Sequence, residues 1–389
     1  MSASTRPRSR FFWVSLTVAA VTGLLAIWGL RPFLTASQEE TPTLLASVPL
    51  PGGPCSLAWS PDGTYLAAGA WGRSIGETGP GEVYVVDVAQ ASVMSTLKTN
   101  SWVEGVAFSP DQKWLAVATR PSIPAGAAPE LILFDVPAFS PKFAAKSEIR
   151  ENGFIDLTWS PDSKALHAIE APVDNAQGKA KVRRWLVPAF TEQPVNRSLD
   201  IEGCVAIAAS PDGRTLAFGE VASATNSLVI RLFDLNTGEV KTTFTVRDGF
   251  KAPRLGFTTE GKAVGVFDTN RLSWWDVATG HPASKSRFAV QPAGLSHMRS
   301  WDSVSPDGAW QARGQERHRG LGDLGWDNRA KEFGAFVDVT EIATGKTRTW
   351  RVGDSSTAPP VAFSPDGTKL AGAVKTPSGA SMFIWAAPK

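Results

Sequence analysis

The hydrophobic and polar positions of this chain of 389 residues follow two different patterns. Residues 11–30, FFWVSLTVAAVTGLLAIWGL, form one run without a charge, whereas the rest alternates short apolar runs with turns rich in Gly, Pro and Asp. Twenty residues cover ~30 Å as a helix, which matches the thickness of a bilayer core. Short apolar runs bounded by turn residues are typical of β-strands. The pattern therefore predicts one transmembrane helix followed by an all-β domain.

The residues that flank the apolar run predict its orientation. Arg6, Arg8 and Arg10 precede it, and basic residues remain preferentially on the cytoplasmic side of a membrane. A cleaved signal peptide is the competing interpretation, but its apolar region normally spans ~7–15 residues and ends in a small-residue cleavage site. The regions expected are a basic cytoplasmic tail (1–10), an uncleaved signal anchor (11–30), a linker (31–42) and an extracytoplasmic domain (43–389). Because no eukaryotic targeting feature is evident, we expect a bacterial inner membrane.

A four-residue motif recurs along the whole β-region. Six copies read Ser-Pro-Asp-Gly or a close variant, and residues 258–261 (TTEG) form a degraded copy in the one interval that lacks the motif. The first residues of successive copies are 49, 51, 50, 48, 47 and 59 positions apart. Pro presets φ at the second turn position and Gly relieves strain at the fourth, so the motif predicts a tight hairpin turn. The predicted turn residues are Pro61, Asp62, Gly63, Pro110, Asp111, Pro161, Asp162, Pro211, Asp212, Gly213, Pro306, Asp307, Gly308, Pro365, Asp366 and Gly367.

Apolar runs flank every copy of the motif. A run before the turn, such as LAWS, and a run after it, such as YLAAG, predict the two strands of a hairpin. A third run such as VYVVDV and a more polar fourth run such as STLKT complete the unit. Seven units of four strands predict a seven-bladed β-propeller. The last unit stops after its third strand, and residues 44–48 supply a spare strand, so we expect a "velcro" closure that joins the two ends of the domain.

These repeats, with their VAFSPDG, LAxG and LFDLxTG segments, resemble the WD40 repeat family over essentially all of residues 43–389. The Ser-Pro-Asp-Gly turn and the hydrophobic-Asp ending of the third strand match that family. The family's Gly-His dipeptide does not recur from unit to unit, and Trp-Asp ends a third strand only at Trp275-Asp276. The resemblance implies the propeller architecture, whereas the family's His–Ser–Asp–Trp hydrogen-bond network does not carry over.

The composition bears on nucleic-acid binding, on the redox state of the cysteines and on the packing of the tryptophans. Three of the 39 basic residues precede position 31, so the remainder carries 36 bases against 37 acids and has no overall field that attracts nucleic acid. Cys55 and Cys204 fall in units one and four, on opposite sides of the predicted ring, and we expect both to be reduced. The tryptophans expected to pack between blades are Trp59, Trp159, Trp185, Trp275 and Trp385.

The connections between second and third strands are the expected binding region, because long loops on a rigid scaffold are common binding sites. We predict long connections in six blades (71–81, 120–129, 170–180, 220–227, 313–333 and 375–380) and a short one in blade five (268–270). The blade-six insertion, RGQERHRGLGDLGWDNRAKEF, combines Trp and Arg, which are enriched at protein interfaces. A self-neutralising charged loop is the alternative interpretation. The candidate residues for binding an acidic protein or peptide are Arg313, Arg317, His318, Arg319, Trp326 and Arg329.

Catalytic and metal-binding motifs are not evident in the sequence. Its four histidines (167, 281, 297 and 318) lack a metal-ligand spacing, and neither a GxSxG elbow nor a GxxxxGK[ST] loop occurs. Residues 341–350 resemble one imperfect copy of the docking motif of quinone-dependent dehydrogenases. The sequence therefore predicts a membrane-tethered, non-catalytic scaffold that binds a protein or peptide and uses no cofactor. The alternative is a propeller enzyme of quinone-dependent or hydrolase type, or a small-ligand binder, that uses the central channel.

Overall fold

All regular elements in the described part of the chain are β-strands. The computed structural model describes residues 41–71, 80–122, 127–148, 152–172, 179–193, 201–222, 227–246, 254–268, 271–283, 302–319, 332–355, 357–376 and 379–389. Residues Glu40–Lys389 form one unit by their mutual contacts. Among the described residues no helix is long and apolar enough to cross a membrane, and the predicted anchor at 11–30 lies outside them.

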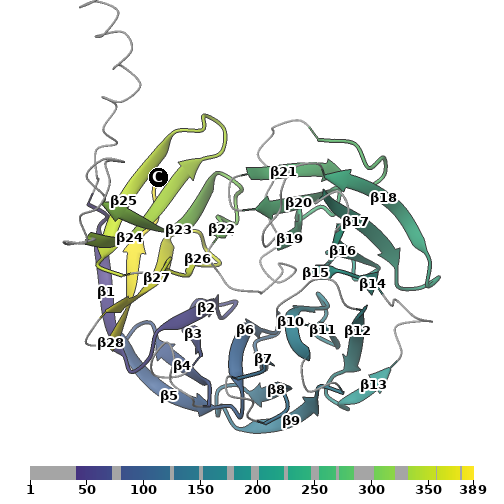
Figure 1. The fold of residues 1–389 in the computed structure, drawn as a ribbon, viewed down its shortest axis with the longest axis horizontal. Coiled ribbons are helices and arrows are strands. Elements are labelled where there is room, and N and C mark those ends of the chain that lie inside the picture. Colours follow the sequence, from purple (N-terminus) through teal and green to yellow (C-terminus); the bar gives the residue numbers. More distant parts are fainter. Residues whose placement is uncertain are drawn as a thin grey trace, which may run out of the picture. The chain divides into compact units, whose positions relative to one another are not determined.

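Seven antiparallel sheets follow one another along this unit and form a ring (Figure 1). Blade 1 consists of β2 (Pro54–Trp59), β3 (Tyr65–Ala70), β4 (Glu82–Asp87) and β5 (Ser92–Lys98). Blade 2 consists of β6 (Trp102–Phe108), β7 (Trp114–Arg120), β8 (Glu130–Asp135) and β9 (Pro141–Lys146). Blade 3 consists of β10 (Asn152–Trp159), β11 (Ala165–Pro172), β12 (Lys179–Leu186) and β13 (Thr191–Gln193), with the short β14 (Ile201–Glu202) also paired to β12.

The remaining four blades complete the all-β, seven-bladed propeller that the sequence predicts. Blade 4 consists of β15 (Cys204–Ala209), β16 (Thr215–Ala222), β17 (Ser227–Asp234) and β18 (Val240–Val246). The described part of blade 5 consists of β19 (Arg254–Phe257), β20 (Ala263–Asp268) and β21 (Arg271–Asp276). Blade 6 consists of β22 (Asp302–Val304), β23 (Trp310–Arg319), β24 (Glu332–Glu341) and β25 (Thr347–Gly353). Blade 7 consists of β26 (Val361–Phe363), β27 (Lys369–Thr376) and β28 (Gly379–Ala386), completed by β1 (Leu44–Leu50).

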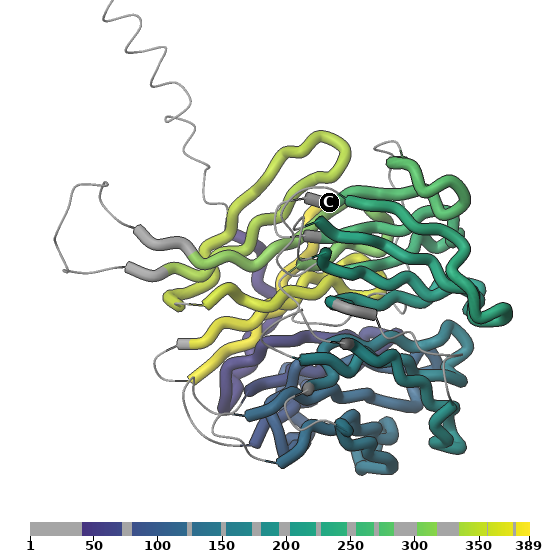
Figure 2. The backbone as a smooth tube through the Cα atoms, turned by 45° about the vertical axis from the view of Figure 1, so that its right-hand side comes forward, coloured from purple at the N-terminus to yellow at the C-terminus, as the bar shows by residue number. Residues whose placement is uncertain are grey.

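The first strand of each blade is the innermost one. Contacts join β2 to β6, β6 to β10, β10 to β15 and β15 to β19, and likewise β22 to β26 and β26 to β2. Colours pass from one sheet to the next in chain order, so each blade packs between its sequence neighbours (Figure 2). A bulge interrupts the pairing of the first strand in blades 1 to 4, at the second, third or fourth residue of the strand.

The predicted closure of the ring is confirmed. Strand β1 pairs with β28 in antiparallel register, and Val48 lies opposite Met382 (Figure 1). Val48 and Leu50 are buried in a cluster that also contains Leu57 and Trp59 of blade 1 and Ile384 of blade 7. The N-terminal strand therefore supplies the outer edge of the last blade, and its inward side chains seal the junction with the first.

Each predicted turn is held by its serine and its aspartate. In the first copy the Ser60 hydroxyl donates to Asp62 (2.7 Å) and accepts from the N–H of Tyr65 (2.8 Å), while the N–H of Thr64 donates to Asp62 (2.9 Å). The serine–aspartate bond recurs in the other five copies at 2.5–2.7 Å. The fourth position has a φ between 59° and 74° in all seven turns, which explains why glycine occupies five of them. The degraded copy keeps the turn, since Gly261 N–H donates to the Thr258 carbonyl (2.8 Å).

Tryptophans pack between blades, as predicted. Trp59, Trp159, Trp185 and Trp385 are buried, and Trp275 packs against the cluster between blades 4 and 5. The Trp59 indole N–H donates to the Ala362 carbonyl of blade 7 (3.0 Å), and the Trp159 indole N–H lies 3.3 Å from the Ala107 carbonyl of blade 2. These indoles bury both their apolar area and their single donor at a junction between blades.

Two of the loop predictions are wrong. In blade 6 the strands continue well beyond the usual length: β23 runs to Arg319 and β24 begins at Glu332, with Arg319 opposite Glu332. In blade 7 Thr376 lies opposite Gly379, so the connection is a two-residue hairpin and not a long loop. Both errors have the same cause: charged or small residues without an apolar alternation were read as loop, although cross-strand pairing places them in the sheet.

The closure predicts an asymmetry between two neighbouring positions of β1. Replacing buried Val48 with Asp places an unpaired charge in the junction of blades 7 and 1, and we expect it to lower the free energy of unfolding by about 3–5 kcal/mol. The matched change Ser47→Asp, at an exposed position of the same strand, should cost less than about 0.5 kcal/mol. Urea unfolding followed by Trp fluorescence measures both, and equal losses would show that the closure contributes no stability.

The turns predict loss of stability in acid. Partial burial by itself raises the pKa of Asp62, Asp162, Asp212 and Asp366, but the serine hydroxyl and backbone N–H donors outweigh it and lower each pKa, that of Asp366 from 3.8 to about 2. A carboxyl with a lowered pKa in the folded state stabilises the fold above its unfolded pKa, and this contribution is lost as the pH falls from about 4 to about 2. Unfolding free energies measured across this range should therefore fall. Ser364→Ala, which removes the donor to Asp366, should flatten the decline; an unchanged slope would contradict this assignment.

Candidate partner-binding surface

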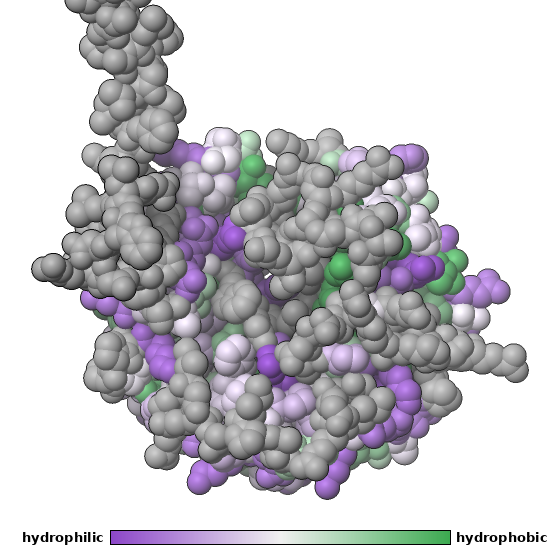
Figure 3. Space-filling view, in the orientation of Figure 1, coloured by the Kyte–Doolittle hydropathy of each residue, from purple (hydrophilic) through white to green (hydrophobic). Residues whose placement is uncertain are grey.

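The connections between second and third strands lie on one face of the ring, called here the loop-rich face. The Ser-Pro-Asp turns lie at the other ends of the same strands and define the opposite, turn face. In the view of Figure 3, hydrophilic side chains line much of the periphery of the described part. The described residues expose only four large hydrophobic side chains, so no broad apolar patch is seen among them.

The structure separates the six residues predicted to bind a partner. Arg313, Arg317, His318 and Arg319 belong to strand β23 and not to a loop, while Trp326 and Arg329 lie outside the described residues. The Nε atom of Arg313 lies 3.8 Å from an oxygen of Asp302 on the adjacent strand β22. The segment from 317 to 319 leads β23 towards the loop-rich face. Their role in partner binding stays a prediction.

An aromatic and cationic cluster at the junction of blades 1 and 2 was not found from the sequence. Trp71 follows β3, Trp102 begins β6 and Arg120 ends β7, so all three lie at the loop-rich face. The two indoles stack with centroids 6.1 Å apart and an interplanar angle of 20°. The Arg120 guanidinium lies 5.4 Å from the Trp71 ring and 5.8 Å from the Trp102 ring. We call this set the Trp–Arg–Trp cluster.

A buried carboxylate fixes the arginine of this cluster. Glu104 lies at the bulge of β6 and is 3% exposed, and its Oε2 atom lies 3.7 Å from Nη1 of Arg120. The side chain of Arg120 is itself only 11% exposed, so the pair is largely removed from water. Trp71 and Trp102 are both partly exposed. The cluster therefore exposes part of two indole rings, which pack on an arginine held in place by a buried carboxylate.

A second set of charges lies among the inner strands of the ring. Asp156 of β10 accepts a hydrogen bond from the N–H of Ile207 (2.9 Å), and Arg254 of β19 donates to the Asp302 carbonyl of β22. Burial lowers the pKa of Arg254, while the carboxylates of Asp156 and Asp302 oppose this effect. With Arg313 also beside Asp302, these charges join blades 3, 5 and 6 across the inner strands. Their mutual neutralisation suits a structural role.

Blade 3 contains a further fixed arginine near the same face. Arg183 donates to both oxygens of Glu192 (2.7 and 2.6 Å) and to Glu170 (3.1 Å), and its guanidinium lies 5.0 Å from the Trp185 ring. Glu170, 1% exposed, also accepts from the Ser147 hydroxyl at 2.6 Å. This network stands in a blade that lacks the Gly-His dipeptide, and its partners are all internal. Its geometry is that of a structural network, in which both oxygens of Glu170 accept internal hydrogen bonds.

The described residues hold no obvious reactive centre. Among them no group of three or more His, Cys, Asp or Glu residues is placed to hold a metal ion. Cys55 and Cys204 are both free and buried, in blades 1 and 4. Burial raises the pKa of the Cys204 thiol, so it stays protonated at neutral pH and is a poor nucleophile.

Comparison with known proteins agrees with the repeat architecture. The family model described as WD domain, G-beta repeat matches residues 46–75 and 91–120. The small ribosomal subunit protein RACK1 of Candida albicans is 32% identical over 112 residues, which cover 29% of this chain and 32% of that protein. MST50-interacting protein 11 of Pyricularia oryzae is 32% identical over 116 residues, which cover 28% of this chain and 32% of that protein. The matched part therefore spans about a third of each relative's length.

A solved structure with the same architecture has little sequence similarity to the chain. Hydrazine synthase of Kuenenia stuttgartiensis superposes with a TM-score of 0.55 at 15% identity, covering 90% of this chain and 98% of that one. At this identity the likeness shows the fold alone. Together, the comparisons identify WD40 repeats in the first two blades of a seven-bladed β-propeller.

Proposed function

We propose that this protein is a membrane-tethered, non-catalytic scaffold whose propeller binds a protein or peptide through its loop-rich face. The Trp–Arg–Trp cluster is the observation that carries this proposal. Trp and Arg are the residues most enriched among those that dominate binding energy at protein interfaces. Partly exposed indoles held by a buried ion pair also lose little side-chain freedom on binding, which favours affinity.

The position of the cluster supports the same function. It lies at the ends of β3 and β7, where the connections of blades 1 and 2 emerge, so a ligand bound there also meets these connections. Repeat matches to a RACK1 protein and to a protein named as MST50-interacting favour a protein partner over a small substrate. Arg317 and Arg319, at the end of β23, extend the proposed surface to blade 6, where their charge suits an acidic partner.

The tether is proposed from the N-terminal sequence. Residues 11–30 carry no charge and match the length of a bilayer span, and three arginines precede them. We place the N-terminus in the cytoplasm and the propeller outside the membrane, in a bacterial inner membrane. A scaffold held there through residues 31–42 would meet partners that are themselves in or near the bilayer.

The binding surface is tested by quantitative crosslinked capture from native membranes with full-length protein. Trp102→Ala should reduce the recovered partner, with an affinity loss of at least ~30-fold, because truncating a central aromatic residue of an interface costs ~2 kcal/mol or more. Trp114→Ala is the matched control, since Trp114 begins β7 at the turn face and packs against Phe190 (5.2 Å). Its capture should match that of the unchanged protein.

The same capture tests the blade-six connection. Replacing residues 320–331 with a short Gly-Ser turn leaves β23 and β24 whole, whereas removing 313–332 would destroy blade 6. Loss of a partner from the replacement variant assigns part of the surface to this connection. If every variant, Trp102→Ala included, recovers the same proteins in the same amounts, the loop-rich face is not the binding surface.

The tether is tested by alkaline extraction of membranes. Full-length protein should stay in the pellet, and a variant that lacks residues 2–30 should be released, because the apolar run supplies the only predicted span. Protease added to intact spheroplasts should digest the propeller of the full-length protein and spare a cytoplasmic control protein. Release of the full-length protein by carbonate would refute the tether without affecting the binding test.

A further inference from the structure

One row of residues breaks the internal symmetry of the propeller. In blade 3, Thr158, His167 and Arg184 lie directly opposite one another on β10, β11 and β12. In every other blade the corresponding three positions carry small residues on the first two strands and an apolar residue on the third. These are Ala58, Ala67 and Val85; Ala107, Ala116 and Leu133; Ala208, Ala217 and Leu232; Gly256, Gly265 and Trp274; Ser303, Ala312 and Val339; and Ala362, Ala371 and Ile384.

The row faces the next blade. In blade 1 the corresponding residues Ala58, Ala67 and Val85 share a cluster with Val103 and Val106 of blade 2. By the same register, the Thr158–His167–Arg184 row faces blade 4. Apolar contacts between blades 3 and 4, including Ile155, Ile169 and Ile207, gather elsewhere in this junction.

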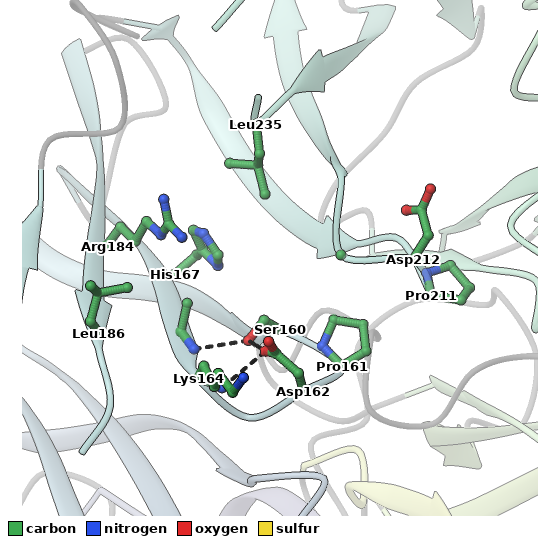
Figure 4. A pocket seen from close by; sticks show the side chains of 12 residues that line it. Ser160, Pro161, Asp162, Lys164, His167, Arg184, Leu186, Pro211, Asp212 and Leu235 are labelled. Carbon is green, nitrogen blue, oxygen red and sulfur yellow. Dashed lines mark hydrogen bonds between the residues drawn. The ribbon is translucent and has the colours of Figure 1, made fainter. Parts of the chain in front are cut away.

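A cavity of about 250 Å³ lies beside this row, between blades 3 and 4 (Figure 4). His167 and Arg184 line it from blade 3, and Pro211, Gly213 and Leu235 line it from blade 4. Its lining runs from exposed residues, such as Asp162, to buried His167, so the cavity reaches from the turn face into the junction. Its volume lies just below the ~300 Å³ at which sites for drug-sized ligands begin.

Four buried polar atoms of the row have no hydrogen-bond partner among the described residues. His167 is 1% exposed, and neither of its ring nitrogens is bonded; the same holds for Nε of Arg184 and for the hydroxyl of fully buried Thr158. An unsatisfied buried polar group costs ~1–3 kcal/mol. Five of the other blades avoid this cost with residues that have apolar or no side chains, and in blade 6 the Ser303 hydroxyl accepts from the N–H of Phe363. The arrangement is therefore unfavourable unless something in the cavity bonds to it.

The charges of the cavity select the class of ligand. Burial and the nearby Arg184 lower the pKa of His167 to about 3, so at neutral pH it is uncharged and offers one N–H donor. Arg184 supplies a positive charge and a further N–H. At the rim, hydrogen bonds hold the pKa of Asp162 and Asp212 below the usual range against the opposing effect of burial, so both are ionised. The exposed Lys164 also lines the cavity and partly offsets these two carboxylates. The inner end, lined by Arg184 and neutral His167, therefore suits one negative charge better than the double charge of a phosphate.

The rest of the lining suits a short hydrocarbon. Leu186 and Leu235 face the cavity from opposite blades, as Figure 4 shows, and Pro161 and Pro211 add apolar surface near the rim. A carboxylate is planar and accepts from both an arginine and a neutral imidazole. We propose that the cavity between blades 3 and 4 binds a monocarboxylate with a short apolar chain, held by Arg184 and His167. The carboxylate belongs either to a free small acid or to the C-terminus of a peptide.

Calorimetric titration of the full-length protein tests this site. Butyrate should bind saturably with one site per chain and should raise the melting temperature. Butyramide, which has the same shape without the charge, and inorganic phosphate should both bind roughly tenfold or more weakly. A peptide ending in Gly-Gly-Val-COOH and its C-terminal amide distinguish the two sources of the carboxylate. If the peptide acid binds and the amide does not, the site accepts a chain terminus as well as a free acid. If butyrate binds and neither peptide does, the ligand is a free small acid.

The double variant His167→Ala with Arg184→Leu supplies the decisive comparison. It restores the residues of the other blades, so it should fold with equal or higher stability and lose butyrate binding by tenfold or more. Arg214→Leu removes one exposed positive charge near the same turn, outside the lining, and should bind butyrate as the unchanged protein does.

Three outcomes would overturn the proposal. The first is that neither butyrate nor the peptide acid binds saturably. The second is that butyramide or phosphate binds as tightly as butyrate, and the third is that the double variant binds butyrate as tightly as the unchanged protein. None of them bears on capture through the loop-rich face, because the cavity opens at the turn face.

Discussion

The pairing of β1 with β28 is the interaction on which the rest of the propeller depends. Each blade packs its two faces on neighbours, so a blade without a neighbour would expose an apolar face, and an incomplete last blade would expose a strand edge. One strand of seven residues prevents both, because it completes blade 7 and covers the junction with blade 1. The Trp–Arg–Trp cluster and the cavity between blades 3 and 4 both lie between blades, and their geometry is set only while the ring is closed.

Most of the fold could be predicted from the sequence because local and global signals agree. The turn motif encodes its own hydrogen bonds: its serine and aspartate bond to each other and to backbone N–H groups only two to five residues away. Such a turn forms without a distant partner, and because it recurs once in each blade, at intervals of 47–59 residues, the number of copies gives the number of blades. The degraded copy at Thr258 also marks a blade, because its threonine hydroxyl and Gly261 preserve the turn.

The binding surface could be predicted only in part, for physical reasons. Arg313 to Arg319 lack an apolar alternation, and only the pairing with β24 shows that they form a strand. Trp71, Trp102 and Arg120 come together from three strands, with a bulge at Glu104 turning the carboxylate towards the arginine, and no local pattern encodes such a meeting. His167 is different: comparison of the seven units with one another would have shown a histidine where the others have Ala or Gly.

The closing strand also has a mechanical consequence. Strand β1 is the first described element of the chain. A pull on the chain from its N-terminal side therefore reaches the hydrogen bonds between β1 and β28 before it reaches any blade's own hairpins. The strand pair that closes the ring is therefore also the first part of the propeller to carry a load applied at that end. The hydrogen bonds between β1 and β28 then limit the force that the propeller withstands in this direction.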